Sequence, residues 1–103
     1  MAYIVLVRDE VYAEALEASM YYESKSEGLG KRFLIALKAS FDKLAAHPGY
    51  YSILSSNSKH VYRDVKVKDF PYVVIFTIVK KNVVVYAVHN THKKLPKRFN
   101  RKW

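Results

Sequence analysis

Basic side chains and histidines in the second half of the sequence are of the types that hold phosphate and transfer protons. Arg63, Lys66 and Lys68 lie close together in the chain, and His92 and Lys93 follow a long apolar stretch. Arginine and lysine bind phosphate oxygens, and histidine exchanges protons near neutral pH. The structural alternative is that Arg63 forms an internal ion pair while the lysines only solvate one strand face. Arg63, His92 and Lys93 are therefore candidate catalytic residues, with both interpretations open.

His89 and His92 also raise the question of a metal site. Only two residues separate them, the chain has no cysteine, and no acidic residue lies near them in the sequence. A stable zinc site needs three or four ligands, so we expect no metal and no cofactor. His89 continues an apolar stretch and is expected to end a strand, which leaves His92 as the better candidate for proton transfer.

The charge of the chain is strongly basic and unevenly placed. Lysine and arginine number 18 against 9 acidic residues, a formal net charge of +9 over 103 residues. Residues 1–27 carry two basic and six acidic side chains, so an acidic first segment precedes a basic body. This balance favours an anionic partner. The residues expected to contact that partner are Lys66, Lys68, Lys94, Lys97, Arg98 and Arg101.

The basic tail at residues 93–103 has two alternative interpretations. Its lysines and arginines could bind nucleic-acid phosphate while Phe99 or Trp103 stacks on a base. Alternatively, the tail could pair with an acidic protein or with the acidic first segment of the chain, because charge complementarity does not identify the partner. The absence of cysteine and of any apolar run near 20 residues favours a cytoplasmic protein without a membrane partner. The short apolar run Tyr3–Val7 meets Asp9 and Glu10 at once, which argues against a signal peptide.

A hairpin of two apolar strands at Phe70–His92 is expected to form the centre of the fold. Its residues on both sides of the turn Lys80–Asn82 are mostly β-branched or aromatic. Because both faces of these strands are apolar, we expect them in the middle of a covered sheet. A strand with at least one solvated face is predicted from His60 to Lys68, where Val61, Arg63, Val65 and Val67 alternate with Tyr62, Asp64, Lys66 and Lys68 on the more polar face. An opening strand is predicted at Tyr3–Val7 and a possible short strand at Tyr50–Leu54.

Two helices are predicted between the opening strand and the later strands. The first begins with Asp9 as N-cap and runs to about Ser24, and the second runs from Leu29 to about His47, where Pro48 and Gly49 end it. On the first helix, Tyr12, Leu16, Ser19 or Met20, and Glu23 recur at helical spacing, whereas Glu10, Glu14 and Glu17 mark the wet side. On the second, the apolar stripe that should cover the sheet is Leu29, Phe33, Leu37, Phe41 and Leu44.

These elements predict one domain over residues 1–103, of the α+β class. The expected architecture is a helical hairpin packed on a small antiparallel sheet, in the order β-α-α-β-β-β, with a fourth late strand possible.

The sequence resembles the RelE/ParE superfamily, the toxins of bacterial toxin–antitoxin (plasmid stabilisation) systems, from about Ile4 to Arg98. The resemblance depends on the order and spacing of several motifs. They are Tyr21-Tyr22 at the end of an acidic helix, Leu29-Gly30-Lys31-Arg32-Phe33, the helix exit from Leu44 to Pro48, Arg63 followed by Phe70-Pro71-Tyr72, and the strand Val83–Val88 with the histidines and lysines after it.

The resemblance implies a small cytoplasmic toxin that arrests growth unless an acidic antitoxin neutralises it. RelE-like members cleave messenger RNA in the ribosome, whereas ParE-like members inhibit DNA gyrase and lack the nuclease residues. The closing strand here, Tyr86-Ala87-Val88, has no inward arginine, and no tyrosine follows the terminal basic cluster. Together with Phe70-Pro71-Tyr72 and the helical hairpin, these departures favour a ParE-like toxin. A RelE-like endoribonuclease and an inactive antitoxin-binding member are the alternatives.

Overall fold

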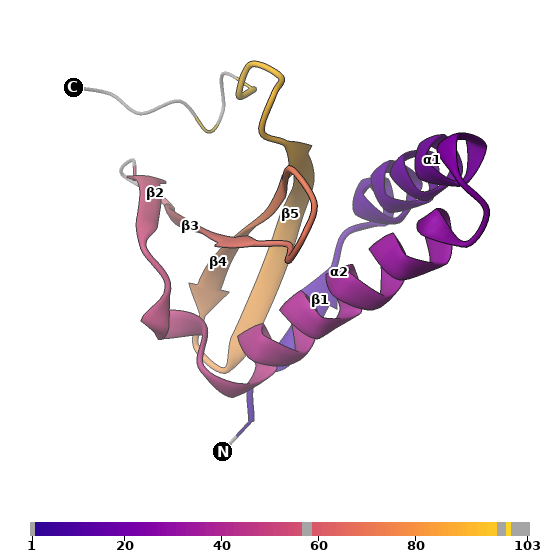
Figure 1. The fold of residues 1–103 in the computed structure, drawn as a ribbon. Coiled ribbons are helices and arrows are strands. Elements are labelled where there is room, and N and C mark those ends of the chain that lie inside the picture. The colour runs from indigo at the N-terminus through magenta and orange to yellow at the C-terminus, as the bar shows by residue number, and fades with distance from the viewer. Residues whose placement is uncertain (1, 57–58, 97–98, 100–103) are drawn as a thin grey trace.

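Two helices packed on a five-stranded mixed sheet make up the fold, which confirms the expected α+β class. The computed structural model describes residues 2–56, 59–96 and 99. Figure 1 shows both helices together on one side of the sheet. The elements in chain order are β1 (Ile4–Val7), α1 (Asp9–Lys25), α2 (Leu29–Ala46), the 3₁₀ helix η1 (Pro48–Tyr50), β2 (Ile53–Ser56), β3 (Val61–Lys66), β4 (Tyr72–Val79) and β5 (Asn82–Asn90).

The sheet differs from the expected antiparallel sheet in strand direction and strand number. Its order is β1-β5-β4-β3-β2, and β1 runs parallel to β5 while the other pairs are antiparallel. Four strands, not three, follow the helices, because β2 pairs with β3 as an edge strand. The expected strand at Tyr50–Leu54 begins only at Ile53, since η1 occupies Pro48–Tyr50. Alternation of side chains reports the faces of a strand but not its direction, so the sequence could not reveal the parallel pair.

The β4–β5 hairpin lies inside the sheet, as its apolar faces predicted. The two strands pair from Tyr72 with Asn90 to Val79 with Asn82, and Lys80 in the turn adopts a left-handed φ of 57°. A register shift between Ile75 and Phe76 marks an irregularity in the ladder. Val74 and Phe76 are buried on the side of the helices, whereas Ile75 is buried on the opposite side. The hairpin therefore contributes to two separate apolar clusters.

The second helix covers the sheet with the predicted stripe. Phe33, Leu37 and Leu44 are buried, and Leu29 and Phe41 pack against the same core as half-buried side chains. Gly30 lies so close to α1 that a Cβ atom there would be 2.4 Å from the Ser19 carbonyl oxygen. The missing side chain thus allows the two helices to approach each other at the hairpin turn.

The prediction for the first helix was wrong about which side is buried, except at Ser19. Val11, Ala15, Ala18 and Ser19 face the interior, while three larger apolar side chains lie in solvent. These are Tyr12, Leu16 and Met20, with exposed fractions of 61%, 59% and 63%. The two apolar stripes are adjacent on the helix, and small alanines permit a closer packing than leucine or methionine would. Asp9 is the first helical residue, and Arg8 takes the N-cap position.

The opposite face of the sheet carries a smaller apolar cluster. Tyr62, Ile75, Ala87 and Phe99 are buried there, and the rings of Tyr62 and Phe99 meet edge to face with centroids 5.0 Å apart. The prediction that Tyr62 lies on a solvated strand face was therefore wrong, because Phe99 from the tail covers it. Among residues 2–56, 59–96 and 99, no helix is long and apolar enough to cross a membrane.

Candidate functional site

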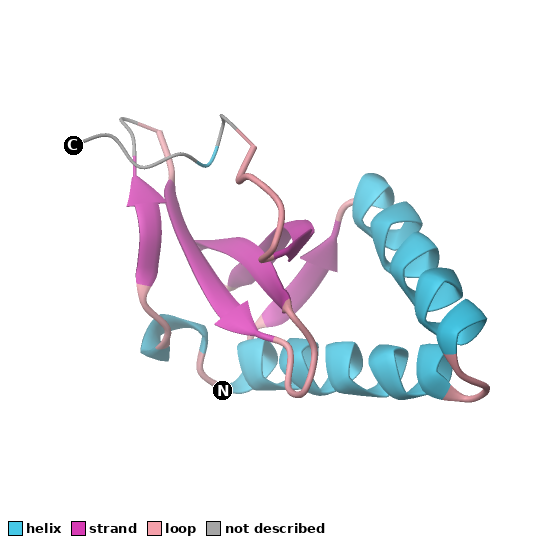
Figure 2. Cartoon of the chain, turned by 45° about the horizontal axis from the view of Figure 1, so that its top comes forward, coloured by secondary structure: helices cyan, strands magenta, loops and turns pink. Residues whose placement is uncertain are grey.

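A cleft of about 600 Å³ separates α1 from the end of the β4–β5 hairpin. In Figure 2 the two helices run in clearly different directions beside the sheet. Chain segments far apart in sequence supply the walls. The lining residues are Glu14, Glu17, Ala18, Tyr21 and Tyr22 from α1, and Pro71, Tyr72, Val88, His89, Asn90, His92 and Lys93 from the hairpin and the turn after it. We call this the α1 cleft.

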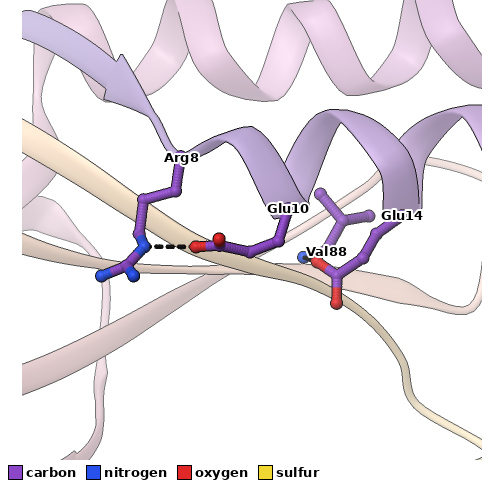
Figure 3. A network of polar contacts seen from close by, with 4 residues as sticks. All are labelled: Arg8, Glu10, Glu14 and Val88. Atoms are coloured by element: carbon purple, nitrogen blue, oxygen red, sulfur yellow. Dashed lines mark hydrogen bonds and ion pairs between the residues drawn. The ribbon is translucent and has the colours of Figure 1, made fainter.

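The α1 wall of the cleft is fixed to an open edge of β5. The parallel partner β1 pairs only with residues 82–85 of β5, so the later residues of that strand face α1. Glu14 accepts a hydrogen bond of 3.1 Å from the backbone N–H of Val88, as drawn in Figure 3. At the start of the same helix, Arg8 pairs with Glu10 and places its guanidinium 5.1 Å from the centre of the Tyr86 ring. A carboxylate of α1 thus replaces a missing strand neighbour.

Aromatic rings form the base of the cleft and connect it to the core. The Tyr22 ring lies 4.9 Å from Phe70 and 6.2 Å from Tyr72, and Phe33 lies 5.1 Å from both Phe70 and Tyr72. Burial raises the pKa of Tyr72, and nearby Glu17 and Tyr21 add to the shift despite an opposing hydrogen bond with Asn90. Burial, followed by the neighbouring Tyr72 and Tyr21, also raises the pKa of Tyr22. Both phenols therefore remain neutral and can donate hydrogen bonds at physiological pH.

The Phe70-Pro71-Tyr72 motif anchors the turn that carries the predicted histidine. The Pro71 carbonyl accepts hydrogen bonds from both the backbone N–H (2.8 Å) and the hydroxyl (3.1 Å) of Thr91. Asn90 accepts a further bond of 2.9 Å from the backbone N–H of His92 through its side-chain oxygen. The turn that holds His92 and Lys93 at the rim of the cleft is therefore ordered by hydrogen bonds from Thr91 to Pro71 and from His92 to Asn90.

The two walls of the cleft carry opposite charge. Glu14 and Glu17 project from α1, whereas Lys93 and the imidazoles of His89 and His92 come from the strand end. A ring nitrogen of His89 is 3.1 Å from the Lys93 carbonyl oxygen, so that imidazole is already held by the turn. His92 and Lys93 are exposed at the rim. This combination of phenols, carboxylates, imidazoles and one lysine suits the binding of a polar segment that bears both charges.

Arg63 lies apart from the other two predicted catalytic residues. Its guanidinium donates a hydrogen bond of 2.6 Å to the Tyr51 carbonyl, and it pairs across the ladder with Phe76. By strand alternation it shares the helix-facing side of β3 with Val65. Phe76 is four residues from Tyr72 on β4, a separation of about 13 Å along the strand. Arg63 therefore supports the chain around η1 and does not join His92 and Lys93 in the cleft.

The predicted partner-binding lysines are also distributed over different surfaces. Lys66 and Lys68 are exposed near the β3–β4 turn, and Lys94 is exposed just beyond the cleft. Lys97, Arg98 and Arg101 lie outside the described residues, as does Trp103. Phe99 is fully buried, which contradicts its proposed role in stacking on a base.

The described part of the chain contains no cluster of three or more histidine or acidic side chains that could hold a metal ion. Sequence reasoning missed Glu14, Glu17 and Tyr22 as cleft residues. Glu14 and Glu17 are three residues apart and so share a helix face, but that pattern usually indicates a solvated surface. Only the open edge of β5 explains why this face lines a cleft.

No protein-family model matches the chain, and a search of curated proteins likewise finds no match.

Proposed function

We propose that the chain is the toxin of a toxin–antitoxin pair and that it arrests growth by binding a protein target, with DNA gyrase as the first candidate. The observation that supports binding over RNA cleavage is the separation of Arg63 from His92 and Lys93. Cleavage of RNA through its own 2′-hydroxyl needs a proton acceptor and cations around one phosphate. Arg63 instead donates to the Tyr51 carbonyl on the helix-facing side of the sheet.

The α1 cleft supports the same proposal as a place where a protein segment could bind. It presents three tyrosine phenols, two carboxylates and three basic side chains over about 600 Å³. Protein interfaces favour tyrosine because its ring contributes apolar area and its hydroxyl a hydrogen bond. An acidic antitoxin would neutralise the toxin by covering part of the basic surface.

A RelE-like ribonuclease is the second candidate, and one observation favours it. His92 and Lys93 share the rim of a cleft with the phenol of Tyr72, which gives a proton donor and two basic groups in one place. This set could act on a phosphate without Arg63.

The test is induction of the chain in bacterial cells with pulse labelling of DNA and protein synthesis over the first minutes. The proposal expects loss of DNA synthesis while translation continues, and inhibition of supercoiling when purified chain is added to gyrase. Immediate loss of translation with cleaved messenger RNA would instead establish the ribonuclease. Absence of growth arrest would exclude both and leave an antitoxin-binding protein.

Two variants separate the candidates further. His92→Ala combined with Lys93→Ala should abolish toxicity if the chain cleaves RNA, but only weaken it if these residues line a binding surface. Arg63→Gln is the matched variant, because it removes a cation of the predicted nuclease set outside the cleft. We expect Arg63→Gln to lower stability and to leave growth arrest in place at low temperature.

A further inference from the structure

A second hollow, of about 470 Å³, lies on the other helix, between α2 and the β3–β4 turn. We call it the α2 hollow. Its lining residues are Arg32, Ile35, Ala36, Ala39, Ser40 and Lys43 from α2, and Lys68, Asp69 and Phe70 from the turn. None of these residues lines the α1 cleft.

Small side chains and a held turn create this hollow. Ala36, Ala39 and Ser40 leave space along the helix, and the buried Ser40 hydroxyl is within hydrogen-bonding distance of the carbonyls of Ala36 (3.3 Å) and Lys66 (3.4 Å). The turn is closed by a backbone bond of 3.3 Å from Phe70 to Val67, and Asp69 adopts a left-handed φ of 70°. The small side chains of α2 and the shape of this turn together form the hollow.

The charge around the α2 hollow is mostly of one sign. Arg32, Lys43 and Lys68 are exposed at its edge, with Asp69 as the single acidic lining residue. Within residues 2–56, 59–96 and 99, none of these three cations forms an ion pair with a carboxylate. Arg32 and Lys43 are 11 residues apart, so they lie on the same side of α2, about 16 Å from each other. A partner that reaches both must present anionic groups over that length.

The floor between these cations is apolar. Ile35 is 60% exposed and lies beside Ala36 and Ala39. Non-specific binding of single-stranded nucleic acid usually relies on exposed aromatic rings on which bases stack. Phe70, the only aromatic lining residue among those described, is 8% exposed and packs edge to face on Phe33. The floor therefore suits an aliphatic side chain better than a base.

We propose that the α2 hollow is the docking site for an acidic amphipathic segment of a partner protein. An aliphatic side chain of the segment packs on Ile35 and Ala39, and its carboxylates pair with Arg32, Lys43 and Lys68. This geometry corresponds to a helix of about three turns laid along α2. The proposal does not depend on the gyrase target or on the α1 cleft.

The test uses a fluorescein-labelled synthetic peptide that forms an amphipathic helix, with glutamates on one face and leucines on the other. Fluorescence anisotropy measures its binding. A peptide with glutamine in place of every glutamate controls for charge, and an oligothymidylate of similar length controls for nucleic acid. The proposal expects saturable, salt-sensitive binding of the glutamate peptide and much weaker binding of the other two probes.

Two matched pairs of variants locate the binding. Arg32→Glu with Lys68→Glu should weaken peptide binding at least about tenfold, because like charges would then face each other. Lys31→Glu with Lys80→Glu makes the same change in net charge on α2 and on a turn, outside the hollow, and should weaken binding far less. Ile35→Ser should weaken binding severalfold, whereas Leu34→Ser, its exposed neighbour outside the hollow, should not.

Three results would overturn the proposal. Equal weakening by both charge-reversed pairs would mean that net charge alone attracts the peptide. Tighter binding of the oligothymidylate, lost with Arg32→Glu and Lys68→Glu, would make the hollow a nucleic-acid site. Absence of saturable peptide binding by variants and wild type alike would leave the hollow without this role. Circular dichroism of each variant would verify that the exposed substitutions leave the fold intact.

Discussion

The α1 cleft and the α2 hollow are lined by different helices of one helical hairpin and differ in chemistry. The cleft combines phenols, carboxylates and basic groups, and its acidic wall is held by a bond from Val88 to Glu14. The hollow combines an aliphatic floor with cations of one sign. The difference arises from the two helices themselves, since α1 carries most of the acidic residues of the chain and α2 carries basic ones.

The two regions nevertheless depend on the same aromatic cluster. Phe33 on α2 contacts Phe70, which lines the hollow, and Tyr22 and Tyr72, which line the cleft. The buried ring of Phe33 thus contacts residues that line both surfaces. Variants of the shared ring, of the contact between the helices and of one cleft phenol should show how far the α1 cleft and the α2 hollow depend on each other.

Removing the shared ring should have the largest effect on both regions. Phe33 is fully buried, so Phe33→Ala should lower the free energy of unfolding by about 3–5 kcal/mol. Urea denaturation followed by circular dichroism measures this loss. Leu34→Ala is the control, because Leu34 is 42% exposed and its truncation should change stability by only about 0.5 kcal/mol. A loss below about 1 kcal/mol for Phe33→Ala would show that the cluster does not hold the hairpin.

A change between the helices should affect the cleft more than the hollow. In Gly30→Ala, the new Cβ meets the Ser19 carbonyl on α1, so α1 must shift, and overpacking of this kind costs about 1–3 kcal/mol. The α2 helix remains fixed to the sheet by Leu37 and Leu44.

Gly49→Ala is the matched control for that substitution, because nothing lies within 4 Å of a Cβ at Gly49. Urea denaturation compares the stabilities, and the acidic peptide reports on the hollow. If Gly30→Ala weakened peptide binding as strongly as Arg32→Glu with Lys68→Glu, the two regions would not be independent.

Patterns in the sequence predicted the elements whose buried side chains are large. The Leu29-to-Leu44 stripe and the β4–β5 hairpin were found because their buried residues are large and regularly spaced. The first helix was misjudged because its buried face consists of Val11 and small residues, while larger Tyr12 and Leu16 lie in solvent. The parallel pairing of β1 depends on long-range contacts that no local pattern encodes.

The candidate sites were predictable only in part for the same reason. His92, Lys93 and Tyr72 were recognised from residue type and motif, and they do meet in the cleft. Arg63 was grouped with them by chemistry, but its position on β3 directs it to the Tyr51 carbonyl. Lys68 joins Arg32 and Lys43 around the α2 hollow only because the β3–β4 turn lies against α2. No local pattern in the sequence predicts that contact.

The smallest expected effect concerns one phenol of the cleft and should appear at high pH. The pKa of Tyr72 is raised in the folded chain, mainly by burial, above its ordinary value of 10.0. As the pH rises past that ordinary value, the unfolded chain loses this proton first, so the stability contribution of Tyr72 falls. Below that pH the contribution is fully present, and Tyr72→Phe should cost about 0.5–1.5 kcal/mol through the lost hydrogen bond with Asn90.

The expected result is therefore that the stability difference between wild type and Tyr72→Phe becomes smaller as the pH rises. Urea denaturation of wild type and Tyr72→Phe between about pH 8 and 11 should show the two stabilities converging, because both proteins share every other titrating group. Ile35→Ser, in the α2 hollow, keeps Tyr72 and should follow the wild-type pH dependence throughout. A constant difference between wild type and Tyr72→Phe would mean that this phenol titrates alike in the folded and unfolded chain, and that the α1 cleft does not shield it from water.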